Sequence, residues 1–179
     1  MIIGITGGTG CGQTTALEVI AQLGGMMLDC AAIYHDLLKA NRDLLGQIAA
    51  RFPGTVAEGQ LLRKKLGQVV FSDPQALSDL NGITHRFVCQ AVEEALKTKP
   101  PLAAIDAIAL VESGLSRLCD VTVAVTAPEA VRVARLMVRD RIPESYARAR
   151  IAAQPSEDFF RTHCDYVVEE KGRVKEGRG

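Results

Sequence analysis

The sequence has little of several residue types that mark particular protein classes. It contains no tryptophan, and aromatic residues make up only 4% of its 179 residues. That scarcity opposes an aromatic platform on which single-stranded nucleic acid would stack. No apolar run approaches the roughly 20 residues that a membrane-spanning helix needs. The first residues, Met1-Ile2-Ile3-Gly4, lack the charged segment of a signal peptide. We therefore expect neither a membrane span nor an export signal.

Net charge and paired cysteines are also missing. Basic and acidic residues number 21 each, so the formal net charge is zero, and the broadly basic surface that binds nucleic acid is not expected. The odd number of cysteines and the absence of CxxC spacing oppose both a disulfide framework and a zinc site. We interpret them as reduced thiols of a cytoplasmic protein, at Cys11, Cys30, Cys89, Cys119 and Cys164.

What the chain does contain is enough apolar sequence for one ordinary domain, residues 1–179. Apolar residues make up 47% of it, and a chain of this length can bury roughly 70% of its unfolded surface. Strand and helix patterns alternate throughout, which predicts an α/β fold with a mainly parallel sheet flanked by helices. About five strands are expected, at residues 1–6, 26–29, 102–106, 120–125 and 166–168.

Helical patterns fill the intervals between these strands. Helices are expected at 14–23, at 31–52 with a break near Asn41, and over several segments of 60–97. Pro74 marks a start inside that stretch, because proline suits the first helical turn. Thr126 and Glu129 predict a capping box before a helix that ends near residue 140, and a shorter helix is expected at 143–153. Residues 31–98 should form a helical region beside the sheet, and residues 171–179 should fray.

The strongest local signal is a glycine-rich turn between the first strand and the first helix. Residues 7–15, the phosphate loop, read GGTGCGQTT, which is close to the motif G-x-x-x-x-G-K-[ST] in the context that motif requires. Its glycines let backbone N–H groups converge on phosphate oxygens, and the helix N-terminus adds a favourable dipole. The alternative is a strand-to-helix turn without a ligand. We favour ATP as the ligand, with Mg²⁺ on Thr14, and contacts from Gly8, Thr9, Gly10, Cys11, Gly12, Gln13, Thr14 and Thr15.

Gln13 stands where the motif has lysine. Lysine neutralises the β- and γ-phosphates and follows the charge as it shifts during transfer, whereas glutamine keeps a neutral N–H donor of similar reach. Removal of a preorganised transition-state donor typically lowers the rate about a hundredfold or more. Binding should suffer less, because the backbone N–H groups remain. Cys11 lies in the same turn, and its thiol pKa is expected to be lowered by the helix N-terminus.

Eight segments, in order, make the chain resemble the dephospho-coenzyme A kinase family over nearly its whole length. They are residues 5–12, 63–71, 80–85, 106–115, 118–120, 135–140, 150–154 and 165–168. That family phosphorylates the ribose 3′-hydroxyl of dephospho-CoA with ATP, the last step of CoA synthesis. The resemblance implies a P-loop kinase fold whose mobile lid, about residues 127–154, brings arginines over the phosphates. For Arg139 it implies phosphate contact, and for substrate contact it implies Arg63, His85, Asp106 and Glu112.

The chain departs from the family at positions to which the family's catalytic or binding roles are assigned. The family's Asp-x-Asp pair, whose second acid is taken as the base for the acceptor hydroxyl, reads Asp29-Cys30-Ala31 here. An aspartate of the family is replaced by Leu62, and a proline by Ile108. The family's asparagine near the adenine site aligns with Glu170. Several polar positions have thus changed together.

Several candidate residues have a structural interpretation as well as a functional one. Asp106 ends an apolar strand, where ligands gather in parallel sheets, so it either holds Mg²⁺ or caps a helix. Asp29 is either a substitute base or a cap. His35 is better explained as a helix-surface histidine than as a catalyst. Arg132 and Arg148 are expected at the surface, paired with acidic neighbours.

Three functions stay open at the level of sequence. The first is ATP-dependent phosphorylation of dephospho-CoA, a small-molecule substrate, without nucleic-acid or membrane partners. The second is a weak or inactive homologue that binds nucleotide or CoA as a regulatory or scaffold module. The third is a kinase with a changed acceptor. Oligomeric state and protein partners do not follow from the sequence.

Overall fold

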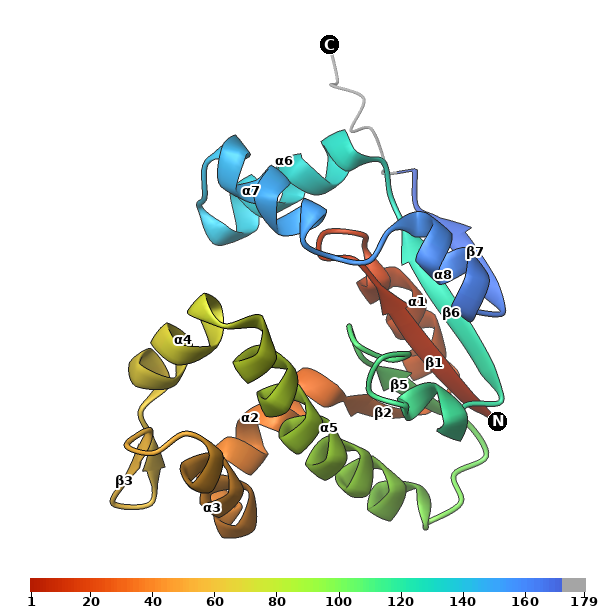
Figure 1. The fold of residues 1–179 in the computed structure, drawn as a ribbon. Coiled ribbons are helices and arrows are strands. Elements are labelled where there is room, and N and C mark those ends of the chain that lie inside the picture. Colours follow the sequence, from red (N-terminus) through yellow and green to blue (C-terminus); the bar gives the residue numbers. More distant parts are fainter. Residues whose placement is uncertain (172–179) are drawn as a thin grey trace.

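A five-stranded parallel sheet forms the centre of the computed structural model, which describes residues 1–171 (Figure 1). The strand order is β2-β5-β1-β6-β7, and each neighbouring pair is parallel. All carboxyl ends therefore point the same way, which places the loops that follow them along one edge. The strands are β1 (Ile2–Gly7), β2 (Met26–Asp29), β5 (Ala103–Asp106), β6 (Val121–Thr126) and β7 (Tyr166–Glu169). The α/β prediction and all five predicted strands are confirmed.

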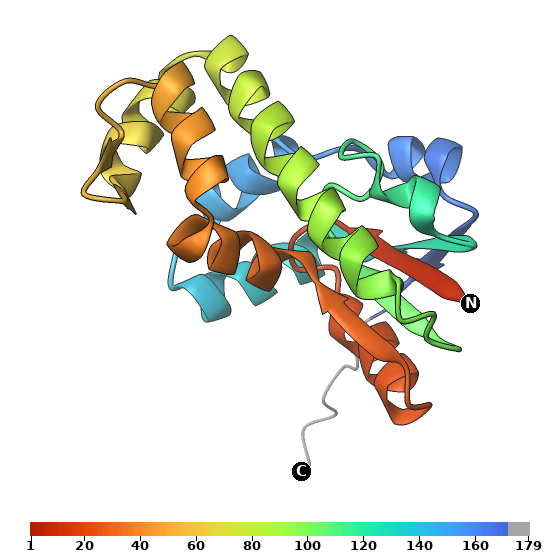
Figure 2. The ribbon, with the colours of Figure 1, turned by 90° about the horizontal axis from the view of Figure 1, so that it is seen from below.

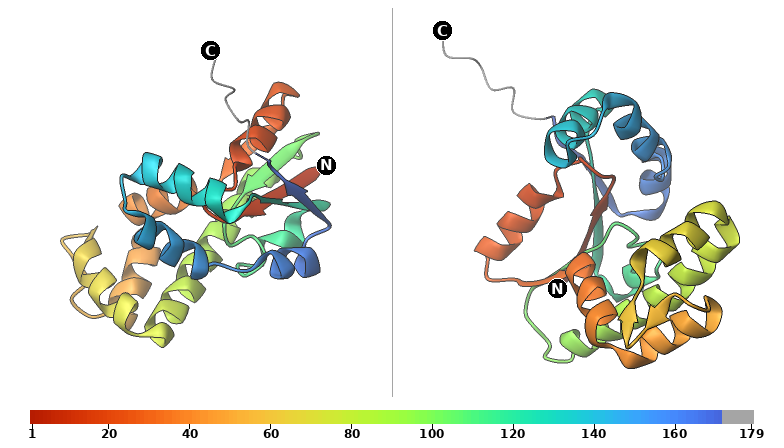
Figure 3. Two further views of the ribbon diagram at one scale, coloured as in Figure 1. Left: turned by 90° about the horizontal axis from the view of Figure 1, so that it is seen from above. Right: turned by 90° about the vertical axis from the view of Figure 1, so that its left-hand side faces the viewer.

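Helices cover both faces of this sheet, as alternate side chains of the central strands require. Ala104 packs in a cluster with Ile20 of helix α1 (Gln13–Gln22), whereas Ile105 packs with Val88 of the long helix α5 (Pro74–Leu96). The two helices lie on opposite sides of the sheet (Figure 3). A short 3₁₀ helix, η1 (Leu115–Leu118), adds Leu115 to the α5 side. Within residues 1–171 no helix is long and apolar enough to cross a bilayer.

The helical region expected at residues 31–98 has an apolar core of its own, beside the sheet (Figure 2). Its helices are α2 (Cys30–Ala40), α3 (Arg42–Arg51), α4 (Arg63–Ser72) and α5. Asn41 and Asp73 cap the starts of α3 and α5 by accepting backbone hydrogen bonds from Leu44 and Gln75. Both breaks in the predicted helical pattern are confirmed. A two-stranded hairpin, β3 (Val56–Ala57) and β4 (Gln60–Leu61), was not predicted.

The lid region contains α6 (Glu129–Asp140) and α7 (Glu144–Ala152), which share a small core of Val133, Leu136 and Ala147. Helix α8 (Glu157–His163), capped by Ser156, was not predicted. The capping box at Thr126 is wrong: Thr126 remains in β6, and Pro128 precedes α6 without a side-chain cap. Within residues 1–171 the buried Thr126 hydroxyl has no hydrogen-bond partner. The fraying expected of the C-terminus falls mainly on residues 172–179, outside the described residues.

Gly7, at the end of β1, lies so close to β6 that we expect a larger residue there to lower the stability of the protein. Its φ is +147°, and a Cβ there would lie 2.3 Å from the Val125 carbonyl oxygen. Gly7→Ala should therefore lower the free energy of unfolding by about 2–4 kcal/mol, through backbone strain and overpacking. Gly46→Ala is the matched control, because Gly46 lies inside α3 with open space around it, and it should stabilise by up to about 1 kcal/mol.

Urea unfolding followed by circular dichroism measures both variants. Equal midpoints for Gly7→Ala and the unmodified protein would contradict the close approach of β1 and β6.

Candidate active site

The phosphate loop keeps a row of backbone N–H groups free between β1 and α1. Gly10 and Gly12 have φ of +77° and +88°, and these left-handed conformations turn the chain sharply. Within residues 1–171 the N–H groups of Gly10, Gly12, Gln13 and Thr14 donate to no protein acceptor, whereas the Cys11 N–H bonds to Gly8 O at 3.2 Å. Free N–H groups at the start of a helix form an anion-binding concavity.

Three arginines of α6 converge on this loop from one helix face. Arg132, Arg135 and Arg139 are three and four residues apart, which aligns them on one side of a helix. Arg132 Nε donates to Thr9 O at 3.0 Å, and Arg135 Nη1 donates to Gly10 O at 3.0 Å. Arg139 Nη2 donates to the Thr9 hydroxyl at 3.2 Å. Positive charge therefore surrounds the loop although the loop itself carries none.

The structure separates the arginines that the sequence grouped together. Arg132 was expected at the surface, and that expectation is wrong because its helix face meets the loop. Arg148 does lie at the surface, bonded to Glu129 at 2.7 Å and Glu144 at 2.8 Å. Arg139, half-exposed, also pairs with Asp140 at 2.8 Å. Hydrogen bonds from Arg139 and then Arg150 lower the pKa of Asp140 to about 2.

Gln13 turns its amide back onto its own loop. Its Nε2 donates to Gly7 O at 3.2 Å, while the side chain also lines the large cavity beside the sheet. Gln154, on the segment between α7 and α8, accepts from Thr9 N–H at 2.8 Å and from Arg132 Nη2 at 2.9 Å. Gln154 had no predicted role, although it belongs to a segment that resembles the family.

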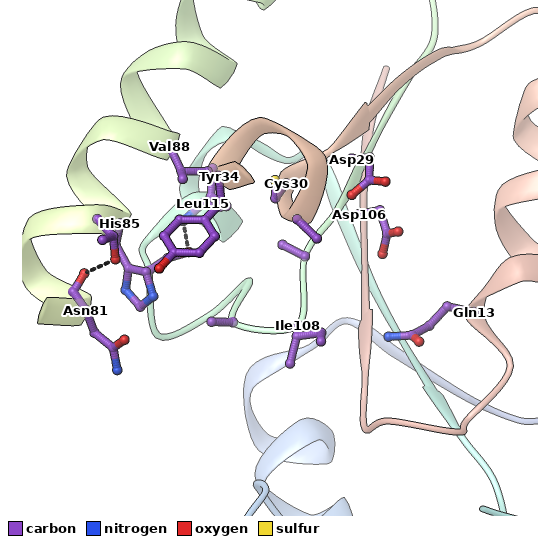
Figure 4. Close-up of a pocket in the computed structure, with 15 residues that line it drawn as sticks. Gln13, Asp29, Cys30, Tyr34, Asn81, His85, Val88, Asp106, Ile108 and Leu115 are labelled. Carbon is purple, nitrogen blue, oxygen red and sulfur yellow. Dashed lines mark hydrogen bonds between the residues drawn. The ribbon is translucent and has the colours of Figure 1, made fainter. Parts of the chain in front are cut away.

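A cavity of about 570 Å³ extends from Gln13 along the carboxyl ends of β2 and β5 (Figure 4). Asp29 and Asp106 end these neighbouring strands in the same register and lie side by side in the wall. Burial raises the pKa of Asp106, and the charge of Asp29 raises it further. Asp29 accepts a hydrogen bond from Ala32 N–H at 3.1 Å. The cap interpretation of Asp29 is therefore confirmed, and the same carboxylate also faces the cavity.

The far wall of the cavity contains His85 together with Tyr34 and Asn81, which the sequence analysis did not select. Tyr34 lies three residues after Ala31 on α2, a spacing that shares a helix face and could have identified it. Burial lowers the pKa of His85, and the nearby charge of Glu112 opposes that shift. Burial also raises the pKa of Tyr34, and the charge of Arg63 opposes it.

Three other candidates lie outside the cavity lining. Arg63 and Glu112 are exposed and act on the lining residues Tyr34 and His85 through charge. His35 is exposed on α2 and does not line the cavity, which agrees with its interpretation as a surface histidine.

The oxygen atoms beside Gln13 fit a cation that takes only a few of its ligands from the protein. Asp29 and Asp106 offer carboxylate oxygens, which Mg²⁺ prefers. Burial, and then the charge of Asp29, raise the pKa of Asp106, and a bound cation would oppose both effects. Thr14 lies exposed at the start of α1. Residues 1–171 contain no cluster of three or more His, Cys, Asp or Glu side chains able to hold a metal. Water and phosphate oxygens must therefore complete any Mg²⁺ shell here.

Cys11 differs from its expected state. Its side chain is 2% exposed and packs with Ile5 and Ile20 beneath the loop. Burial raises the pKa of the thiol, and the opposing effects of Arg132 and of backbone hydrogen bonds are smaller. The expected lowering of its pKa is wrong because the thiol is buried in the core.

The family model and the curated relatives that match the chain indicate one family. The family model CoaE, dephospho-CoA kinase, matches residues 1–176. The dephospho-CoA kinase of Thermobifida fusca (strain YX) is 32% identical over 178 residues, which cover 97% of this chain and 89% of that protein. The crystal structure of TT1252 from Thermus thermophilus has a TM-score of 0.80 at 31% identity, covering 97% and 90%. The dephospho-CoA kinase from Campylobacter jejuni has a similar fold, with a TM-score of 0.66 at 22% identity, covering 97% and 89%.

The burial of Cys11 predicts its reactivity. In the folded protein Cys11 should be alkylated by iodoacetamide at pH 8 far more slowly than in urea, because reaction requires an exposed thiolate. The half-buried Cys164 is the internal control and should react faster than Cys11. Labelling over time, mapped by mass spectrometry, measures both rates in one sample. Faster labelling of Cys11 than of Cys164 would contradict the buried position.

Proposed function

The chain belongs to the dephospho-CoA kinase family, and on that premise we propose that it transfers the γ-phosphoryl group of ATP to the ribose 3′-hydroxyl of dephospho-CoA. The observation that carries this proposal is the position of Gln13. That residue joins the free N–H groups of the phosphate loop to the cavity that holds Asp29 and Asp106. A phosphoryl donor on the loop and an acceptor in the cavity would therefore meet at Gln13.

The donor site combines backbone N–H groups with charge from α6. The free N–H groups of the loop would bind phosphate oxygens, and the guanidinium of Arg139 is our candidate for contact with the transferred group, since planar forks match phosphate geometry. Mg²⁺, when bound, would neutralise charge on the phosphates. Asp106 and Thr14 would hold it, with Asp29 beside them. Arginine thus supplies the charge that Gln13 lacks.

The acceptor site has a polar entrance and an apolar wall. His85 would contact the acceptor inside the cavity, while Arg63 and Glu112 would act from its margin. Asp29 is our candidate for the group that takes the proton of the hydroxyl, because Ala31 has no acid to offer. The proton would pass to an Asp29 oxygen as the new O–P bond forms and the γ-phosphorus separates from ADP. Ala31 and Ile108 stand where the family has an aspartate and a proline, so the wall of the cavity carries one acidic side chain fewer. An acceptor other than dephospho-CoA is therefore one of the outcomes to test.

One observation favours a second candidate, a binding module with little turnover. The Gln13 amide donates to Gly7 O at 3.2 Å instead of extending over the loop, and the second acid after β2 is absent. Hydrogen bonds to charged groups contribute about 1.5–3 kcal/mol and neutral ones about 0.5–1.5 kcal/mol. Ground-state binding would then persist while transition-state stabilisation falls.

A coupled ADP-release assay with dephospho-CoA, beside calorimetric titration of ATP–Mg²⁺ and of CoA, tests the proposal. We expect saturable ATP–Mg²⁺ binding in the millimolar range and slow turnover that requires dephospho-CoA. Binding without turnover would favour the binding module. Turnover with a different nucleoside acceptor would favour the changed acceptor. Folded protein that binds no ATP would contradict the donor site.

Restoring both missing groups should raise the rate. Gln13→Lys places a positive charge beside the transferred phosphoryl group, and Ala31→Asp provides a carboxylate that can accept the proton of the hydroxyl. Positioned acid–base catalysis contributes typically about 10²–10⁴-fold to the rate. Each single change should increase turnover, and the pair should increase it further without reaching the product of the two. Ala32→Asp is the matched control, since it adds an acid to the same turn of α2 outside the cavity lining. A folded double variant that binds ATP but does not turn over would decide for the binding module.

A further inference from the structure

Glu170 places a carboxylate directly against the phosphate loop. Its backbone N–H donates to Thr126 O at 2.7 Å, which fixes the residue just beyond β7. A Cβ added to Gly12 would lie 1.5 Å from Glu170 Oε2, so this oxygen fills the space over the last glycine of the loop. The carboxylate therefore lies against the backbone of Gly12, the last glycine of the loop.

Arg135 holds that carboxylate in place. Its Nη1 lies 2.9 Å from Glu170 Oε2 and 3.0 Å from Gly10 O. The two side chains are 33% and 30% exposed, so solvent screens the pair less than it would a fully exposed one. While the pair is closed, the Glu170 carboxylate offsets the Arg135 charge beside the loop.

The opposite end of the loop is covered in a similar way. Gln154 Oε1 accepts the Thr9 N–H at 2.8 Å and is bonded to Arg132 Nη2 at 2.9 Å. A Cβ on Gly8 would lie 2.1 Å from Arg132 Nη2 and 3.0 Å from Gln154 Oε1. Acceptor oxygens from distant parts of the chain thus lie against both ends of the phosphate loop, at Gly8 and at Gly12.

We propose that Glu170 is a specificity-determining residue, which selects against nucleotides in proportion to the charge of their phosphates. Its carboxylate and the Gln154 amide oxygen form an internal latch where phosphate oxygens would bind. A triphosphate must displace Glu170 and take over Arg135, whereas an uncharged nucleoside meets no such repulsion. This inference rests on the proposed nucleotide site and adds the residue that sets its affinity.

Calorimetric titration of Glu170→Gln with ATP–Mg²⁺ and with adenosine tests the latch. Glutamine keeps the size of the side chain and an oxygen for Arg135 but removes the charge. We expect the ATP dissociation constant to fall about tenfold, in line with removal of one close charge, and to change by a larger factor than the adenosine dissociation constant does. Glu169→Gln is the matched control: Glu169 is exposed, and within residues 1–171 it has no ion-pair partner. It should leave ATP affinity unchanged.

Melting temperatures establish that each variant is folded, and Glu170→Ala provides a second neutral variant should glutamine unfold the chain. Equal ATP affinity in Glu170→Gln and the unmodified protein would overturn the latch and leave the nucleotide site standing. An equal gain in Glu169→Gln would also overturn it, because net charge alone would then explain the effect. Folded variants that bind no ATP at all would overturn both the latch and the proposed donor site.

Discussion

The site depends on a small number of backbone N–H groups that have no acceptor in the described part of the chain. They exist because β1 ends at Gly7 and α1 begins at Gln13, and the turn between them uses left-handed glycines. A helix start leaves its first N–H groups without partners. In this fold that start faces the carboxyl edge of a parallel sheet, where Asp29 and Asp106 also end their strands. The arrangement provides an anion site beside two carboxylates, whichever side chain occupies position 13.

Charge at the loop comes from α6, not from the loop itself. Arg132, Arg135 and Arg139 each reach a loop oxygen from one helix face. Their guanidinium groups are fixed by contacts to Gln154, Glu170 and Asp140. Arginine cannot follow a migrating phosphoryl group from inside the loop as lysine does, yet it can hold phosphate in the ground state. We therefore expect binding and turnover to be separable in this protein. The absence of a lysine charge at position 13 and of an acid at position 31 should lower mainly turnover.

Much of the fold follows from local sequence, because strands and helix starts are encoded locally. Apolar runs located the five sheet strands, and the break near Asn41 and the proline at position 74 predicted the starts of α3 and α5. In the structure Asn41 and Asp73 cap these two starts. The hairpin at residues 56–61 was missed because its strands are two residues long. Thr126 misled because Pro128 begins the turn into α6 while Thr126 still pairs in β6.

The candidate site was predicted less completely, because its decisive contacts join residues far apart in the chain. Thr9 and Gln154 are 145 positions apart, and no local pattern links them. The same holds for Arg132 on Thr9, expected at the surface, and for the Glu170 carboxylate over Gly12. Local spacing located the loop correctly but predicted the wrong direction for the pKa shift of the Cys11 thiol. A turn determines where the backbone N–H groups point, whereas tertiary packing determines where the thiol points. Motif spacing thus predicted a phosphate-binding loop, and the structure was needed to locate the charged groups around it.

The most direct test of the role of α6 is to compare the ATP–Mg²⁺ affinities of Arg139→Gln and Arg148→Gln. Both residues are half-exposed arginines of the lid, but only Arg139 reaches the phosphate loop, through Thr9. If α6 replaces the missing lysine charge, calorimetry should give a dissociation constant raised about tenfold or more for Arg139→Gln, since a charged hydrogen bond contributes roughly 1.5–3 kcal/mol. Arg148→Gln should bind ATP as the unmodified protein does. Equal affinities for the two variants would contradict the account.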